Sequence, residues 1–419
     1  MAEPLMNSHA ETSSEADVDP YVDLYADRMA GMSASEVRAL FAVASRPDVV
    51  SLAGGMPFVS ALPGDDIKDV VLGVLRDHGS SALQYCGGTG LPGVRERIVA
   101  LMAEEGVDAS PDAVVVTNGA QQALDLIGKI FVDAGDEIVV EEPSYVGALS
   151  AFSAYEPRFV QIPLDDEGMV VSALEEALGR GARPKFVYTV PNFSNPAGVT
   201  MSLERREQLV DVCREAGIPI VEDNPYGMLR FEGEPLPTLR SMDSGNVIYL
   251  GTLSKVFAPG IRVGWALAEP GTLDRLVLAK EAADLCSSAL TQLVAERYLS
   301  GSRWRSNLGT LVGVYRSRRD TMLESLEREF PAGARWTKPH GGFYVWVTTP
   351  GVDTPSLLTH AVDHRVAYVP GTAFYPDGRG RNRMRLSYCY PPEEAIREGV
   401  RRLGSLLSER ADLPSVASR

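Results

Sequence analysis

Short apolar runs alternate with segments of helical periodicity through the middle of the chain. The apolar runs, found between residues 113 and 268, are AVVVT, EIVVEE, RFVQIPL, KFVYTV, IPIVED, NVIYLG and RVGWALA. The segments between them, such as GAQQALDLIGKIF and SLERREQLVDVCREAG, repeat apolar residues at the spacing of an amphipathic helix. Strands that are apolar throughout and alternate with helices are typical of a mostly parallel, doubly wound sheet. The pattern therefore predicts an α/β fold built on such a sheet.

The pattern changes after about residue 300. A long helical stretch leads there to the runs FYVWV, VAYVPG and RMRLSY, and then to a final helix over residues 392–408. We expect a smaller α+β domain here. The predicted organisation is a disordered tail over 1–19, an N-terminal segment over 20–60 that joins the small domain and covers the functional site, a large domain over 61–300 and the small domain over 301–419. In the N-terminal segment, a helix capped by Ser33 or Ser35 is expected from apolar residues at helical spacing, namely Val37, Leu40, Phe41 and Ala44.

Charge and cysteine content exclude several classes of function. The chain has 40 basic and 56 acidic residues, a formal net charge of −16, which opposes binding to nucleic acid or to anionic membranes. No apolar run approaches the ~20 residues that cross a bilayer, and the acidic N-terminus lacks the features of a signal peptide. We therefore expect a cytoplasmic protein. Neither a disulfide framework nor a metal site is predicted, because the four cysteines are far apart: Cys86, Cys213, Cys286 and Cys389.

Polar residues follow several of the predicted strands. Ligands of a doubly wound sheet bind at the carboxyl ends of its strands, so the residues just after the strands carry the most information. We expect them to face one crevice: Asn118 to Gln121, Tyr145, Asn192 to Asn195, Asp223 and Lys255.

The stretch YLGTLSKVFAPGIRVGW, residues 249–265, places a lysine after a strand and an arginine seven residues later. A lysine that forms a Schiff base with pyridoxal phosphate needs such a strand-end position beside a cleft, and Lys255 fits it. Arg262 follows a tight Pro-Gly turn and could clamp the phosphate with two hydrogen bonds. An isolated lysine and arginine would more often be surface residues, so the neighbouring motifs decide.

Those neighbours suit the same cofactor. Asp223 ends a strand where a buried carboxylate needs a cation, and a pyridinium nitrogen would supply one. Tyr226 and Asn195 could donate to the phenolate oxygen of the ring, and Tyr145 could stack on it. The helix that begins after Gly119 offers backbone N–H groups to a phosphate. Each residue alone is more often an ordinary turn residue, so the argument depends on their combination.

Taken together, the motifs SLAGGMP, LQY, GAQQAL, EEPSY, NPAG, EDNPYG, LSKVFAPGIRVGW and RMRLSY resemble those of a known family in their order. Over residues 20 to about 410 the chain is similar to fold-type I pyridoxal-phosphate-dependent aminotransferases of class I/II, above all to the 2-aminoadipate and kynurenine aminotransferase group. The resemblance implies the transfer of an amino group from a 2-aminoadipate-type, aromatic or branched-chain L-amino acid to a 2-oxo acid such as 2-oxoglutarate, by a ping-pong mechanism. It also implies that the large domain binds the cofactor.

The resemblance also implies a role for each site residue. Lys255 would be the Schiff-base lysine and proton carrier, Asp223 the partner of the ring nitrogen, and Tyr226 with Asn195 the donors to the ring oxygen. The residues implied for the phosphate are Thr252, Ser254, Arg262, Ala120, Gln121 and, in a homodimer with composite sites, Tyr85 of the neighbouring subunit.

For the substrate, Gly55 would offer its backbone and Arg38 would meet an acidic side chain. Arg383 and Arg385 lie on the same face of their strand by the period of two, so alternation does not choose between them. The family pattern favours Arg385 as the ligand of the α-carboxylate.

Two positions depart from the family and two alternative functions stay open. Ala120 stands where many relatives have Ser, which removes one hydroxyl contact to the phosphate, and His340 replaces a residue that is often acidic. The first alternative is another pyridoxal-phosphate reaction on an amino acid, such as decarboxylation, lysis or oxidation. The second is a transcription regulator with an aminotransferase-like domain, which the short, acidic N-terminal segment disfavours.

Overall fold

The computed structural model describes residues 19–32 and 46–411. The predicted tail over 1–19, apart from its last residue, and the predicted helix near 33–45, which contains Arg38, lie outside the described residues. Within 19–32 the chain forms two short 3-10 helices, η1 (Val22–Leu24) and η2 (Asp27–Gly31).

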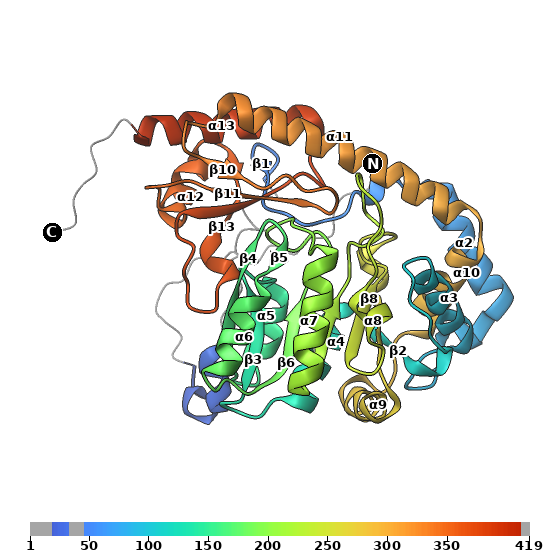
Figure 1. Ribbon diagram of the computed structural model, residues 1–419. Helices are drawn as coiled ribbons and strands as arrows, with labels where there is room; N and C mark the ends of the chain where they lie inside the picture. The colour runs from blue at the N-terminus through green and yellow to red at the C-terminus, as the bar shows by residue number, and fades with distance from the viewer. Residues whose placement is uncertain (1–18, 33–45, 412–419) are drawn as a thin grey trace.

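An eight-stranded sheet forms the larger part of the molecule (Figure 1). Its order is β2-β9-β8-β7-β6-β3-β4-β5, and the inner pairs β8-β7, β7-β6, β6-β3 and β3-β4 are parallel. The prediction of a mostly parallel sheet is confirmed. β9 runs antiparallel to both of its neighbours, β8 and β2. The strands are β2 (Val114–Asn118), β3 (Glu137–Glu142), β4 (Arg158–Asp165), β5 (Gly168–Met169), β6 (Pro184–Thr189), β7 (Ile220–Asp223), β8 (Val247–Thr252) and β9 (Val263–Leu267).

Helices cover both faces of this sheet, as the fully apolar strands require. On one face, Val139, Val187 and Ile220 pack in a cluster with residues of α6 (Val171–Gly179) and α7 (Leu203–Ala216). On the other, alternate residues of the same strands pack with α4 (Ala120–Phe131) and α5 (Val146–Ser153). The other helices of this part are α2 (Gly64–His78), α3 (Pro92–Ala103), α8 (Leu239–Met242), α9 (Pro270–Asp284) and α10 (Ala289–Ser300), with the 3-10 turns η3 (Val59–Ala61), η4 (Gly79–Leu83), η5 (Pro111–Ala113) and η6 (Pro259–Ile261).

A smaller four-stranded sheet of order β10-β11-β14-β13 lies beside the carboxyl ends of the large one (Figure 1). All of its strand pairs are antiparallel. Separately, β1 (Val50–Ser51) pairs in parallel with β12 (Val366–Ala367), so the N-terminal segment reaches this region. The domain boundaries themselves stay a prediction. The remaining elements are α11 (Arg303–Glu329), β10 (Arg335–Trp336), β11 (Tyr344–Thr348), α12 (Thr354–Asp363), β13 (Val369–Pro370), η7 (Gly371–Phe374), β14 (Arg383–Ser387) and α13 (Glu393–Ala411).

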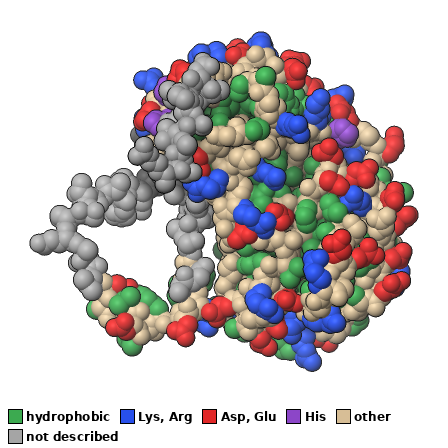
Figure 2. Space-filling model, turned by 60° about the vertical axis from the view of Figure 1, so that its left-hand side comes forward, with side chains coloured by type: hydrophobic (Ala, Val, Ile, Leu, Met, Phe, Trp, Pro, Cys, Tyr) green, Lys and Arg blue, Asp and Glu red, His purple; other side chains and the backbone are tan. Residues whose placement is uncertain are grey.

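The surface carries both signs of charge. Figure 2 shows basic and acidic side chains interspersed on one face, with hydrophobic side chains between them. Among the helices in the described ranges, none is long and apolar enough to cross a bilayer.

Helices α11 and α13 pack closely against each other and lie side by side in Figure 1. Gly404 of α13 is buried, and a Cβ atom there would lie 2.3 Å from the backbone oxygen of Glu329. Gly309 of α11 is exposed, and a Cβ there would meet nothing within 4 Å. Glycine is therefore required for packing only at the first position.

We expect Gly404→Ala to lower the free energy of unfolding by about 1–3 kcal/mol, because the helices must separate to admit a methyl group. Gly309→Ala, the matched control, should raise it by about 0.5–1 kcal/mol, since alanine favours an exposed helix interior. Urea unfolding of both variants measures the two effects. A shift of the same sign in both would contradict this account of the α11–α13 contact.

Candidate active site

A cavity opens at the carboxyl ends of the central strands, where the sequence predicted a ligand site. Apolar residues Leu124, Val190, Pro225 and Pro259 form part of its wall. The structure also brings together there all the residues predicted to contact the cofactor within one subunit: Ala120, Gln121, Tyr145, Asn195, Asp223, Tyr226, Thr252, Ser254, Lys255 and Arg262.

One end of the cavity is built from the turn between β2 and α4. Gly119 caps α4 with φ 75°, a conformation that favours glycine, and a Cβ there would lie 2.5 Å from Nη2 of Arg262. Arg262 donates from Nη2 to the backbone oxygen of Asn118 at 3.0 Å. A guanidinium thus lies beside the free N–H groups of a helix N-terminus, and both attract an anion.

The same part of the cavity also contains hydroxyl groups from Thr252, the last residue of β8, and from Ser254, just after it. The Thr252 hydroxyl donates to Ser254 Oγ at 2.9 Å and accepts from the Ser254 backbone N–H at 3.1 Å. Gln121 turns its side chain toward α5, since its Nε2 donates to the backbone oxygen of Gly147 at 2.7 Å. Ala120 has no hydroxyl, so Ala120 and Gln121 have their backbone N–H groups to offer here.

The opposite end contains a buried carboxylate that is only half satisfied. Oδ2 of Asp223 accepts from the hydroxyl of Tyr188 at 2.9 Å, whereas Oδ1 has no hydrogen-bond partner within the described residues. Burial raises the pKa of Asp223 to about 6, while the Tyr188 hydrogen bond and the charge of Lys255 limit that rise. An unpaired buried carboxylate oxygen is costly, so it fits a cationic donor such as a protonated ring nitrogen.

Burial also tunes the other titratable groups of the cavity. It lowers the pKa of Lys255, whose Nζ lies 5.9 Å from the centre of the Phe343 ring, and so favours the neutral, nucleophilic amine. Burial raises the pKa of Tyr226 and of Tyr145 above the ordinary value of a phenol, which is itself protonated at neutral pH, so both hydroxyls are available as donors. The site therefore combines a reactive amine with hydroxyl donors.

A buried arginine of the small sheet does not line the cavity but contacts a residue of its wall. Arg385 donates from Nη1 to Oδ1 of Asn195 at 2.9 Å and from Nη2 to the backbone oxygen of Ala53 at 2.8 Å. Its guanidinium carbon lies 4.2 Å from the centre of the Tyr344 ring. Arg383 instead donates to the hydroxyl of Tyr375 at 2.6 Å. The two arginines share a strand face, but the contact with Asn195 ties Arg385 to the cavity.

The N-terminal segment approaches this arginine with its backbone. A Cβ atom at Gly55 would lie 2.0 Å from the hydroxyl oxygen of Tyr344, so a side chain there would displace the tyrosine. The Cys389 thiol donates to the backbone oxygen of Met56 at 3.2 Å and helps to hold this segment. Gly55 therefore lies against Tyr344, the ring of which faces Arg385, and its role as a substrate contact stays a prediction.

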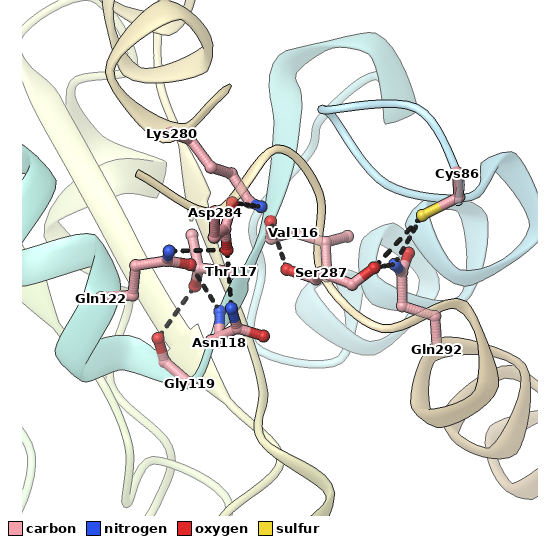
Figure 3. A network of polar contacts seen from close by, with 10 residues as sticks. All are labelled: Cys86, Val116, Thr117, Asn118, Gly119, Gln122, Lys280, Asp284, Ser287 and Gln292. Carbon is pink, nitrogen blue, oxygen red and sulfur yellow. Dashed lines mark hydrogen bonds and ion pairs between the residues drawn. The ribbon is translucent and has the colours of Figure 1, made fainter. Parts of the chain in front are cut away.

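Tyr85 lies outside the cavity and is 77% exposed. Its loop is held through the next residue, since Cys86 Sγ donates to the backbone oxygen of Ser287 at 3.2 Å and accepts from Gln292 Nε2 at 3.3 Å (Figure 3). Its side chain is thus free to contact another molecule. His340 is exposed and absent from the cavity wall, and its backbone oxygen accepts from Phe231 N at 2.7 Å.

Comparison with known proteins identifies the fold and its chemistry. A family model described as aminotransferase class I and II matches residues 57–403. The chain belongs to this family.

An aromatic-amino-acid aminotransferase from Thermococcus litoralis is 45% identical over 94% of this chain and 96% of its own length. A 2-aminoadipate transaminase from Thermus thermophilus is 40% identical over 90% of this chain and 94% of its own. A crystal structure of Pyrococcus horikoshii kynurenine aminotransferase with PMP has a TM-score of 0.90 at 41% identity, covering 95% of this chain and 100% of that one.

The aminotransferase therefore has fold type I, depends on pyridoxal phosphate and acts on an amino acid and a 2-oxo acid. The cofactor supplies an aldehyde that condenses with amines and a protonated ring that withdraws electrons from the substrate Cα. The residues present fit it, because the unpaired oxygen of Asp223, the amine of Lys255 and the guanidinium of Arg262 line one cavity.

Two residues of the aminotransferase site escaped the sequence argument, which considered mainly the residues just after strands. Tyr188 lies inside β6, and Tyr344 begins β11. For Tyr188 a signal existed: a phenol within the apolar run KFVYTV needs a partner for its hydroxyl, and the carboxylate that ends the next strand, Asp223, is a suitable one. No comparable signal singles out Tyr344.

We expect Tyr188→Phe to raise the pKa of Asp223, because the variant loses the hydroxyl that stabilises its charged form. If Asp223 must be ionised for activity, the acidic limb of the kcat/KM profile should move to higher pH by about one to two units, the equivalent of the ~1.5–3 kcal/mol of a hydrogen bond to a charged group. Above that limb, kcat/KM should change by less than about threefold. A uniform loss at every pH would instead indicate damage to packing.

Proposed function

We propose that this cavity carries out transamination, with Lys255 as covalent anchor and proton carrier, Asp223 as partner of the ring nitrogen and Arg262 as clamp of the phosphate. One observation carries the proposal. The half-satisfied carboxylate of Asp223 lies in the same cavity as a lysine of lowered pKa and, at the other end, an arginine beside a helix N-terminus. These are the groups that a phosphorylated, cationic pyridine aldehyde requires.

The remaining groups orient the ring. The Oδ1 atom of Asn195 accepts from Arg385, which leaves its Nδ2 to donate to the ring oxygen. The hydroxyl of Tyr226 would donate to the same oxygen, and Tyr145, which lines the same cavity, would stack on the ring. Lys255 would take the proton from the substrate Cα and deliver it to the carbon that carried the cofactor aldehyde. A ping-pong exchange depends on this proton transfer.

Arg385 binds the α-carboxylate of the substrate. Its guanidinium is buried, its Nε has no partner within the described residues, and both of its recorded acceptors are uncharged oxygens. A carboxylate could replace them with charge-assisted bonds. Gly55 contributes its backbone on the same side.

The names of the relatives support aromatic and 2-aminoadipate-type amino acids as donors. A branched-chain donor is supported by the Thermus thermophilus alpha-aminoadipate aminotransferase structure, which holds a phosphopyridoxyl adduct of leucine. The acceptor 2-oxoglutarate stays a prediction. Arg38 lies outside the described residues, so its pairing with an acidic side chain stays a prediction.

A cytoplasmic location is supported by four cysteines that are all free thiols.

A homodimer with composite sites is supported by exposed apolar side chains. Leu83 and Tyr85 are 73% and 77% exposed, and Tyr85 is the residue expected to reach the phosphate of the neighbouring subunit. Residues 19–32 also leave apolar side chains uncovered: Tyr21, Val22, Leu24, Tyr25, Met29 and Met32. Surfaces of this kind are typical of subunit contacts.

Lys255→Ala should abolish transamination, because no other group in the proposal moves the proton. Mixing the wild-type protein with amino acid alone should convert its cofactor to pyridoxamine phosphate, measured by loss of the visible absorbance band, and the variant should not. Near-normal turnover of the variant would refute the role of Lys255. A wild-type protein that consumes the amino acid without forming pyridoxamine phosphate would indicate a different reaction.

Arg385→Gln should reduce kcat/KM for every α-amino acid donor by about 30- to 1000-fold, the equivalent of the ~2–4 kcal/mol of a buried bidentate pair. Arg383→Gln is the matched control on the same strand face and should change it by less than about threefold. Initial rates with a panel of donors measure both. Equal losses in the two variants would remove the distinction drawn between these arginines.

A further inference from the structure

A buried ion pair lies behind the turn that we assign to the phosphate (Figure 3). Nζ of Lys280 and Oδ1 of Asp284, both near the end of α9, are 2.8 Å apart, and the Lys280 side chain is fully buried. Neither residue lines the cavity. The Asp284 side chain is 18% exposed, but burial of the charged lysine is costly, so the position of this pair needs a reason.

The second oxygen of Asp284 supplies that reason. Oδ2 accepts from Asn118 Nδ2 at 2.6 Å and from Gln122 Nε2 at 2.7 Å. Asn118 ends β2 and Gln122 lies in the first turn of α4. One carboxylate oxygen therefore joins the two sides of the turn around Gly119, as Figure 3 shows.

Further bonds lead from this bridge to the cavity. Oε1 of Gln122 accepts from the backbone N–H of Asn118 at 2.8 Å, and the backbone oxygen of Asn118 accepts from Nη2 of Arg262 at 3.0 Å. Asp284 thus acts on the helix N-terminus through Gln122 and on the guanidinium through Asn118. These are the two groups that face the anion.

We propose that Asp284, neutralised by Lys280, is a positioning residue for cofactor phosphate binding. The inference rests on the phosphate site assigned above. An unpaired carboxylate behind that site would repel a phosphate dianion, whereas the ion pair provides an acceptor for two amides without net charge. The pair fixes the directions of the N–H groups and of Arg262 and touches no residue at the ring end.

This role predicts that variants of Asp284 lose affinity for ligands that carry the phosphate group, and for those alone. In Asp284→Ala, the amides of Asn118 and Gln122 lose their common acceptor, and the turn no longer holds its donors in place. The dissociation constant of the apoenzyme for pyridoxal phosphate should rise by about 10- to 100-fold, since about 1.4–2.7 kcal/mol of fixed charge-assisted bonding is lost. The constant for pyridoxal, which lacks the phosphate, should change by less than about twofold.

Absorbance titration of the apoenzyme with each ligand measures both constants. Asp274→Ala, an exposed residue on the same helix, is the matched control and should alter neither. The double variant Lys280→Gln/Asp284→Asn keeps an uncharged acceptor for the two amides and should restore pyridoxal phosphate binding to within about threefold of wild type. If Asp284→Ala does not fold, Gln122→Met removes one of the two amides bound by Asp284 together with the acceptor of the Asn118 backbone N–H, and should again weaken the binding of pyridoxal phosphate alone.

If Asp284→Ala loses the same affinity for pyridoxal phosphate and for pyridoxal, Asp284 only stabilises the fold. If it loses affinity for neither ligand, the turn is rigid without Asp284. Either result overturns the inference. Arg262→Ala separates this failure from that of the phosphate site. A selective loss of pyridoxal phosphate in Arg262→Ala but not in Asp284→Ala would overturn the role of Asp284 alone. No selective loss in Arg262→Ala would overturn the site assignment and the inference with it.

Discussion

The structure depends on one carboxylate at the end of a buried strand. Asp223 projects from β7 on the face covered by α4 and α5, where water is largely excluded, and the phenol of Tyr188 satisfies only one of its oxygens. A fold would not retain such a group for stability alone, since an unpaired buried acceptor costs about 1–3 kcal/mol. The sheet order brings the other participants to this carboxylate: Lys255 lies in the turn after β8, and Arg262 lies just before the antiparallel β9 and faces the start of α4.

Much of this arrangement was predictable because it depends on local patterns. Apolar runs alternating with helical periods specify a parallel sheet, and the strand ends specify where ligands bind, so Asp223 and Lys255 could be found from position and chemistry. The direction of β9 was not predictable, since strand pairing is a long-range property. Nor was the choice between Arg383 and Arg385 available from alternation, because it depends on which of them meets Asn195 across the two sheets.

The residues that sequence reasoning missed act through others. In the sequence, Tyr188 resembles its neighbours in the strand, and only its hydrogen bond to Asp223 distinguishes it. Asp284 likewise lies near the end of an ordinary helix, and only its bonds with Asn118 and Gln122 distinguish it. Such roles come from contacts between segments far apart in the chain. A motif records the groups that face the ligand, whereas the groups that hold them leave little pattern in the sequence.

The resting contacts of Arg385 have a consequence for selectivity. Its guanidinium already donates to the Asn195 amide oxygen and to the Ala53 backbone oxygen, so a ligand must exchange these bonds rather than add to an empty site. A neutral ester or primary amide would offer acceptors no better than those it displaces, while an ionised carboxylate offers stronger ones. If Arg385 binds the α-carboxylate as proposed, these two protein oxygens compete with the ligand and disfavour uncharged analogues.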